Sequence, residues 1–198
     1  VAHGPIEVLL TIDEEAGMSG ACLLESGVLT GQWLFNIDTE EWGELYLGCA
    51  GSIDVEVEQP LNYEPIPENL NIVNIQVAGL KGGHSGVDIH LGRGNANVIL
   101  ARFLNQHLAS LGGHLVEFTG GTARNALPRE AVATIAISPN QLSSLEKLLA
   151  EYQTTWKKQL KGIDDNLQLS IQPTGAEVTE AIAQQQQNEW LQALATSP

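Results

Sequence analysis

Hydrophobic residues in the first forty positions form two short runs that predict strands. The runs "PIEVLLTI" (residues 5–12) and "QWLFNID" (residues 32–38) are almost continuously apolar, which is typical of strands covered on both faces in a parallel sheet. Between them, "EAGMSGACLLESG" predicts a short helix that ends near Gly27. The order strand, helix, strand predicts one βαβ unit of an α/β layer, with acidic residues at the carboxyl end of each strand.

The middle of the chain has a weaker pattern. "LYLGCAGSIDVEVEQP" alternates as one or two further strands would, and "PLNYEPIPENL" is rich in proline and asparagine, which favours a connector. We therefore place a boundary after residue 68, with a partial α/β domain and its connector in residues 1–68 and a second domain in residues 69–198.

The second domain has a regular series of predicted elements. Strands are predicted at residues 71–80, 114–121, 130–138 and 166–174, and helices at residues 94–112 and 140–162. The order βαββαβ is the ferredoxin-like α+β arrangement, a sheet with two helices on one face. The tail contains a glutamine run, but the helical spacing of its apolar residues predicts a final amphipathic helix.

Charge narrows the classes of partner. The 198 residues include 9 basic and 24 acidic side chains, a formal net charge of −15, which argues against a nucleic acid or an anionic membrane surface and leaves divalent cations as compatible ligands. We find neither a run of apolar residues long enough to span a membrane nor a signal peptide, so a cytoplasmic protein is expected. Cys22 and Cys49 lack C-x-x-C spacing and are expected to be reduced and buried.

Three consecutive acids, Asp13, Glu14 and Glu15, follow the first predicted strand and have two interpretations. They could cap a helix and offset its dipole, a contribution of about 0.3–1 kcal/mol each. Alternatively, they could belong to a ligand site, since ligands of open α/β sheets bind outside the carboxyl ends of strands, where Asp38 also lies. Carboxylates at that edge resemble half of a divalent metal site, but the sequence offers no H-E-x-x-H and no obvious histidine partner.

Two glycine- or turn-rich stretches stand out in the second domain. "GLKGGHSGVDIHLGRGNAN" (residues 79–97) surrounds His84 with glycines, and "GGTARNALPREA" joins two predicted strands. Each could be no more than a connecting loop. Phosphate binding is disfavoured because neither G-x-G-x-x-G nor a G-K-[ST] ending occurs there.

Taken together, "TIDEEAGMSGA", "FNIDTEEWGELYLGCAGS" and these two stretches resemble the aminoacylhistidine (Xaa-His) dipeptidases, also called bacterial carnosinases. That family belongs to the clan of cocatalytic dizinc exopeptidases, with peptidase T and the aminoacylases. The resemblance covers almost the whole chain. It implies a central fragment: part of a zinc-exopeptidase α/β catalytic domain, followed by a ferredoxin-like lid and dimerisation domain.

In the first domain, the resemblance assigns roles to three acids. Glu14 matches the general base that takes a proton from the attacking water, Glu15 matches a ligand of one zinc ion, and Asp38 matches a ligand of the other. Asp13 is expected to serve the local geometry of the strand-to-helix turn. Glu40 and Glu41 have no assigned role and are expected to be solvated.

In the second domain, the resemblance implies three further site residues. His84 matches a lid histidine that acts as an electrophilic helper at the scissile carbonyl and is often supplied across a dimer. Asn125 matches a lid asparagine that contacts substrate, and Arg124 beside it is a candidate for the same role.

The resemblance thus implies a metallopeptidase with a pair of zinc ions, replaceable by cobalt or manganese, that cleaves short peptides with a C-terminal histidine. It also implies a homodimer formed through the lid. Several family metal ligands have no counterpart in this chain, so the chain alone is expected to be inactive. Two alternatives remain open: a dimerisation or interaction module with merely solvated acids, or a related aminoacylase or tripeptidase.

Overall fold

The computed structural model of the chain describes residues 2–38, 41–49, 51, 53 and 55–197. The chain divides into two compact units between residues 57 and 58, which is before the boundary predicted after residue 68. Residues 58–68 fall in the second unit, where β1 (Tyr63–Pro65) pairs antiparallel with β8 (Glu180–Ile182). The assignment of the units to a catalytic and a lid domain stays a prediction.

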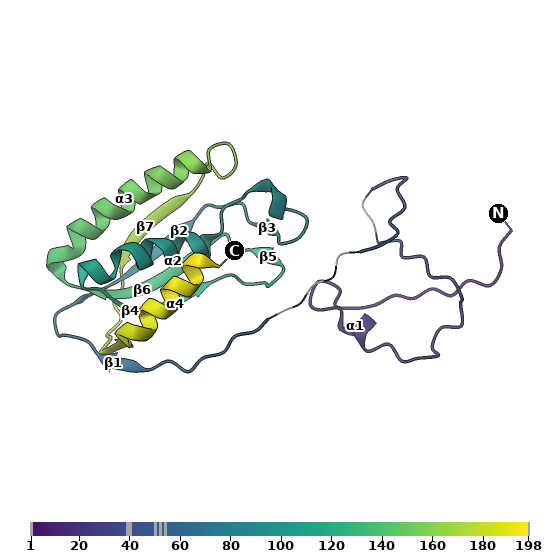
Figure 1. The fold of residues 1–198 in the computed structure, drawn as a ribbon, viewed down its shortest axis with the longest axis horizontal. Coiled ribbons are helices and arrows are strands. Elements are labelled where there is room, and N and C mark those ends of the chain that lie inside the picture. The colour runs from purple at the N-terminus through teal and green to yellow at the C-terminus, as the bar shows by residue number, and fades with distance from the viewer. Residues whose placement is uncertain (1, 39–40, 50, 52, 54, 198) are drawn as a thin grey trace. The chain divides into compact units, whose positions relative to one another are not determined.

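The second unit is built on a four-stranded antiparallel sheet. Its strands are β2 (Asn71–Ala78), β4 (His114–Gly120), β6 (Ala131–Ile137) and β7 (Gln168–Pro173), in the order β4-β6-β2-β7 (Figure 1). With one helix between β2 and β4 and another between β6 and β7, this is the predicted ferredoxin-like arrangement, which is confirmed.

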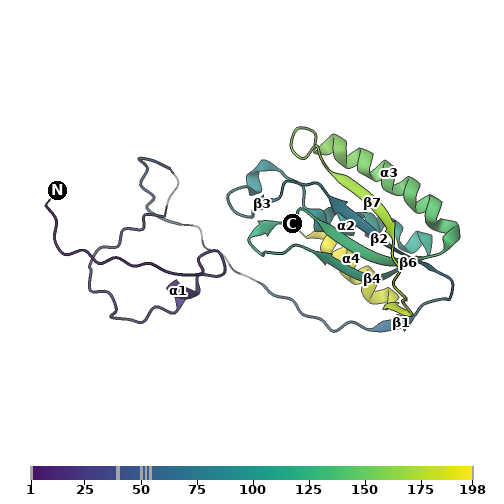
Figure 2. The same ribbon diagram turned by 180° about the vertical axis from the view of Figure 1, so that it is seen from behind.

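Helices cover one face of this sheet, as the two opposite views show (Figures 1 and 2). They are α2 (Ala96–His107), α3 (Leu142–Gln159) and α4 (Gln184–Thr196). The predicted helix over residues 94–112 is shorter at both ends. The side chain of Asn95 caps α2 by accepting a 3.2 Å hydrogen bond from the Val98 N–H, and the last turn continues as the 3-10 helix η2 (Ala109–Leu111).

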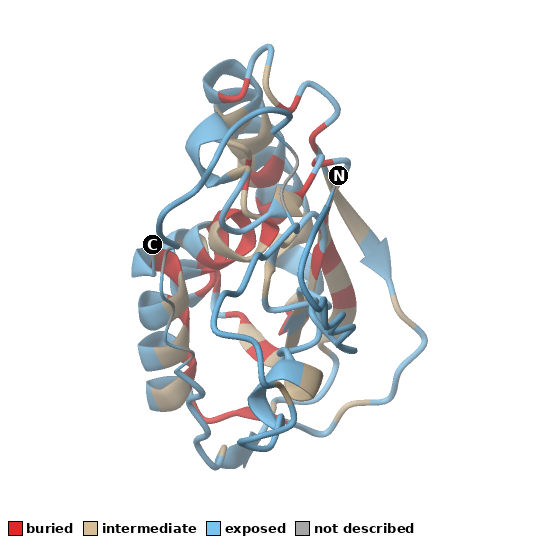
Figure 3. Ribbon diagram, turned by 90° about the vertical axis from the view of Figure 1, so that its right-hand side faces the viewer, coloured by how far each residue is buried: buried red, intermediate tan, exposed pale blue. Residues whose placement is uncertain are grey.

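The core lies between the sheet and the helices (Figure 3). Alternate residues of β2, namely Val73, Ile75 and Val77, are buried, whereas the residues between them are half-buried, as expected for a sheet covered on one face. The other face carries polar side chains, and there the Thr134 hydroxyl donates a 2.9 Å hydrogen bond to Oδ1 of Asn74.

The glutamine-rich tail forms the predicted final helix, α4, whose Leu191 and Ala195 are buried. Gln187 is also fully buried, and its Oε1 accepts a 2.6 Å hydrogen bond from the Leu115 N–H. This bond falls beside the β-bulge between Leu115 and Glu117, so one glutamine of the run satisfies an irregular position of β4.

The expected secondary structure of the first unit is not formed. The strands predicted at residues 5–12 and 32–38 are wrong for this structure, as is the prediction of one or two strands in residues 45–60 for the described part of that run. The predicted helix reduces to α1 (Ser19–Cys22). A strand needs a neighbour to satisfy its backbone N–H and C=O groups, and the described residues of this unit contain no such ladder.

Apolar side chains of the first unit are consequently exposed. Leu10 is 87%, Ile37 88% and Leu47 99% exposed. So many exposed hydrophobic side chains are typical of a surface that packs against other protein. Cys22 and Cys49 are free thiols but exposed, so the prediction of buried cysteines is wrong.

The side chain of Glu7, in the first predicted strand segment, contacts the residues just before the second segment. The Glu7 carboxylate accepts hydrogen bonds from the Thr30 N–H (2.9 Å), the Thr30 hydroxyl (2.9 Å) and the Gly31 N–H (2.7 Å). These bonds, led by the one from the Thr30 backbone, stabilise the carboxylate and lower the pKa of Glu7. The first segment is thus linked by a side chain, and not by a strand ladder, to the two residues that precede the second segment.

No helix among the described residues combines the length and the apolar character needed to cross a bilayer.

Candidate functional site

Asp13 organises the acidic turn of the first unit. Its φ of 57° is left-handed, its carbonyl accepts hydrogen bonds from the N–H groups of Met18 (2.6 Å) and Ala16 (3.2 Å), and its Oδ2 accepts one from the Ser19 hydroxyl at 2.5 Å. This confirms the predicted local role of Asp13. The turn leaves the next two acids, Glu14 and Glu15, at an exposed position.

The third acid assigned by resemblance, Asp38, is also exposed, and its N–H donates a 2.9 Å hydrogen bond to Oδ1 of Asn36. Across the described residues, no group of three or more His, Cys, Asp or Glu side chains could hold a metal ion. Carboxylate side chains are of a type that binds zinc, but the described residues do not place enough of them together to form a zinc site. Glu40 lies outside the described residues, and Glu41 is exposed, as expected.

In the second unit the structure brings together the residues of both unusual loops. Two short strands, β3 (Gly83–His84) and β5 (Ala126–Leu127), pair antiparallel with His84 opposite Ala126. The Ser85 N–H donates a 2.8 Å hydrogen bond to the Asn125 carbonyl. His84, Arg124 and Asn125 are therefore neighbours, although the sequence separates them by about forty positions.

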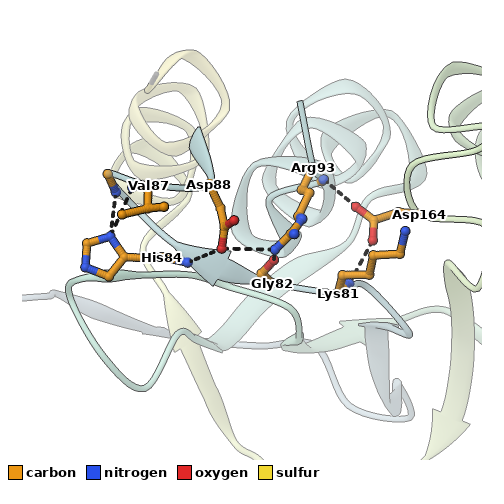
Figure 4. A network of polar contacts seen from close by, with 9 residues as sticks. Lys81, Gly82, His84, Val87, Asp88, Arg93 and Asp164 are labelled. Carbon is orange, nitrogen blue, oxygen red and sulfur yellow. Dashed lines mark hydrogen bonds and ion pairs between the residues drawn. The ribbon is translucent and has the colours of Figure 1, made fainter. Parts of the chain in front are cut away.

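The imidazole of His84 is exposed, but its tautomer is defined by its own loop. Nδ1 accepts hydrogen bonds from the N–H groups of Gly86 (3.0 Å) and Val87 (3.2 Å), as Figure 4 shows. A nitrogen that accepts two N–H bonds carries no proton, so the ring proton is on Nε2. His84 thus offers an N–H donor on an exposed side chain.

A network of two further side chains holds the backbone of His84. Oδ2 of Asp88 accepts hydrogen bonds from the His84 N–H at 2.9 Å and from Nη1 of Arg93 at 3.1 Å (Figure 4). Arg93 Nη1 also donates a 2.7 Å bond to the Gly82 carbonyl. Gly83 must lack a side chain here, since a Cβ would overlap both Arg93 Nη1 and Asp88 Oδ2.

Sequence reasoning missed Asp88 and Arg93, together with the buried Asp164 that Figure 4 also shows. The sequence signal for the first two was the mixed charge within the glycine-rich stretch. Asp164 gave no such signal, because an Asp-Asp pair before a predicted strand is typical of a solvated turn. In the structure Asp165 is exposed, as such a turn would have it, and Asp164 is buried.

The arrangement in the second unit suits recognition of a polar substrate group. An imidazole N–H is a donor suited to an oxygen on which negative charge develops, and the adjacent Arg124 guanidinium is a donor suited to a carboxylate. Arg124 is exposed and Asn125 half-buried, so both lie at the surface beside His84.

Comparison with known proteins gives consistent matches. Residues 75–164 match the family model of the peptidase dimerisation domain of the M20 type. The cytosol non-specific dipeptidase of Escherichia coli (strain K12) is 45% identical over 183 residues, which is 92% of this chain and 38% of that protein.

A solved structure shows the same relationship. The crystal structure of aminoacylhistidine dipeptidase from Vibrio alginolyticus aligns with 99% of this chain at 42% identity and a TM-score of 0.77, and the match covers 40% of that protein. This chain therefore spans about two fifths of the length of the relatives it matches.

The comparisons therefore show that residues 75–164 match a peptidase dimerisation domain and that the chain is similar, along almost its whole length, to part of two dipeptidases.

Proposed function

We propose that the polypeptide carrying this chain is a cytoplasmic dizinc dipeptidase that hydrolyses dipeptides with a C-terminal histidine. The observation that carries this proposal is the identity of more than 40% to two dipeptidases, one of them an aminoacylhistidine dipeptidase, over nearly the whole chain. The dimerisation-domain match supports a homodimer formed through the second unit. Hydrolysis of a peptide bond is the activity that both relatives' names have in common.

The first unit contributes three acids to the proposed reaction. Glu15 and Asp38 would be ligands of the zinc pair, and Glu14 would accept a proton from the attacking water and return it to the leaving amine. A zinc ion, when bound, polarises the peptide carbonyl and makes water a stronger acid. Two adjacent glutamates can have these separate roles, because the metal ion would lower the basicity of the Glu15 carboxylate that binds it, whereas the Glu14 carboxylate would remain basic enough to accept a proton.

The second unit contributes donors. His84 would stabilise the oxyanion with the N–H of Nε2, the atom that its loop leaves protonated and exposed. Asn125 and Arg124 would contact the substrate, and a guanidinium suits the terminal carboxylate of a dipeptide.

The proposal predicts a substrate preference and a metal requirement. We expect the purified polypeptide to hydrolyse Xaa-His dipeptides faster than dipeptides with the same first residue and a C-terminal alanine, and to lose activity on treatment with a chelator. Zinc should restore the activity, and cobalt or manganese should restore part of it. Hydrolysis of an N-acyl amino acid or a tripeptide in preference to every dipeptide would instead point to an aminoacylase or a tripeptidase.

The metal ligands predict a second result. Glu15→Ala and Asp38→Ala should each reduce the bound zinc by about one ion per subunit, because each removes one carboxylate ligand. The zinc content is measured by elemental analysis after dialysis against a weak chelator. Glu41→Ala is the matched control, since it removes an exposed acid of the same segment to which no role is assigned. Unchanged zinc content and activity in both ligand variants would favour an interaction module.

A further inference from the structure

Asp164 is one of the few polar residues in the core of the second unit, with only 1% of its surface exposed. It lies in the connection between α3 and β7, and its backbone N–H bonds to the Leu160 carbonyl at 2.9 Å. A buried carboxylate costs free energy unless hydrogen bonds compensate for the lost water. The bonds that compensate here come from a different part of the chain.

The Asp164 carboxylate binds both ends of the loop that carries His84. Oδ1 accepts a 2.7 Å hydrogen bond from the Lys81 N–H, just after β2, and Oδ2 accepts a 2.7 Å bond from the Gly94 N–H, just before α2 (Figure 4). One carboxylate therefore closes the loop of residues 82–93 at its base. We call this contact the Asp164 clasp.

Glycines next to the clasp indicate how closely the base of the loop is packed. Gly79 has a φ of +79°, and a Cβ there would overlap the carbonyl of Asn166, which belongs to the segment that carries Asp164. A Cβ on Gly94 would lie 2.8 Å from the Leu80 side chain. Gly79 and Gly94 thus allow the chain at the two ends of the loop to approach the segment of Asp164 and each other.

The clasp continues directly into the network around His84. Gly94 follows Arg93 in the chain, and Arg93 binds the Gly82 carbonyl and the Asp88 carboxylate. Asp88 in turn accepts the His84 N–H. A continuous series of contacts therefore leads from the buried Asp164 at the base of the loop, through Arg93 and Asp88, to the backbone of the exposed His84.

We propose that Asp164 is a positioning residue for His84: by clasping Lys81 and Gly94 it keeps Arg93 and Asp88 where they hold the His84 backbone, and so keeps Nδ1 against its loop and the Nε2 donor toward the substrate. The proposal rests on the proposed function for the role of His84 in hydrolysis. The geometric part, that the clasp defines the tautomer and orientation of His84, needs no activity.

The first variant is Asp164→Asn, which keeps the volume of the side chain but replaces one acceptor oxygen by an NH₂ group, so that one of the two loop ends loses its partner. We expect kcat to fall about 10- to 100-fold with little change in KM, the size of effect produced by misplacing a reacting group. Asp165→Asn is the matched control: it is exposed, undergoes the same chemical change one residue later, and should retain wild-type kcat.

The second measurement is the ¹⁵N NMR signature of the His84 ring in the 198-residue chain. The wild type and Asp165→Asn should show the Nε2–H tautomer, whereas Asp164→Asn should show a mixture of tautomers. Arg93→Met, which removes the guanidinium at a partly exposed position, should show the same mixture and covers the case in which Asp164→Asn does not fold.

These measurements separate the two proposals. A wild-type tautomer in folded Asp164→Asn and Arg93→Met would overturn the clasp, and so would a lower thermal stability with unchanged kcat, which is the mark of a merely structural residue. If the tautomer shifts as expected but His84 variants retain full dipeptidase activity, the clasp stands and the proposed role of His84 in hydrolysis falls.

Discussion

The substitution His84→Asn is expected to lower kcat for dipeptide hydrolysis about 100- to 1,000-fold, the loss found when one oxyanion donor is removed from an enzyme. Asparagine is chosen for a geometric reason. Its Oδ1 can occupy the position of the imidazole Nδ1 and still accept the N–H groups of Gly86 and Val87, so the loop keeps its internal hydrogen bonds. Its shorter side chain places no donor at the position of Nε2.

His84→Gln is the complementary variant. Its amide NH₂ can reach the position of Nε2, but it provides no acceptor where Nδ1 lies. We expect it to retain more activity than His84→Asn if the donor matters most, and less if the two loop bonds matter most. Steady-state kinetics on an Xaa-His dipeptide measures both.

His90→Asn is the matched control for this pair. His90 belongs to the same loop, in the 3-10 helix η1 (Ile89–Leu91), and is exposed, but it has no place in the proposed site. It should keep wild-type kcat. If His84→Asn were as active as this control, His84 would not be the oxyanion donor.

The second unit could be predicted from the sequence because its elements are defined locally. The alternation along β2 and the apolar stripes of α2 and α3 each occur within one continuous segment, and each element finds its partner inside the same unit. The ferredoxin-like order then follows from the sequence of elements.

The first unit could not be predicted in this way. The runs at residues 5–12 and 32–38 have the composition of buried strands, but a strand is stabilised by its neighbours and not by its own propensity. Among the described residues they have no ladder, and Leu10 and Ile37 remain exposed. A local pattern indicates what a segment can become, and the structure depends on which partners are present.

The same distinction applies to the site. His84 could be singled out because its neighbours in the sequence are unusual, and Asp13 because a turn was expected there. Asp164 could not, since it acts on Gly94 from 70 positions away and nothing in its own segment indicates burial. The tautomer of His84 likewise depends on backbone N–H groups, which the sequence does not distinguish.

The substitution Glu14→Gln is expected to have the largest effect, a fall in kcat of about 100- to 10,000-fold, because it removes a proton acceptor while keeping the size of the side chain. The turn should survive, since Asp13 and its bonds to Met18 and Ser19 hold it without Glu14. The zinc content should therefore equal that of the wild type, which distinguishes a proton carrier from a ligand.

Glu15→Gln tests the opposite assignment in the neighbouring residue. It should reduce the zinc content, and added zinc should restore part of its activity, whereas added zinc should not restore Glu14→Gln. Kinetics and elemental analysis on both variants, with Glu41→Gln as the control, decide the matter. If Glu14→Gln lost zinc and Glu15→Gln kept it, the two roles would have to be exchanged; if neither variant changed zinc content or kcat, the acids would only cap the turn.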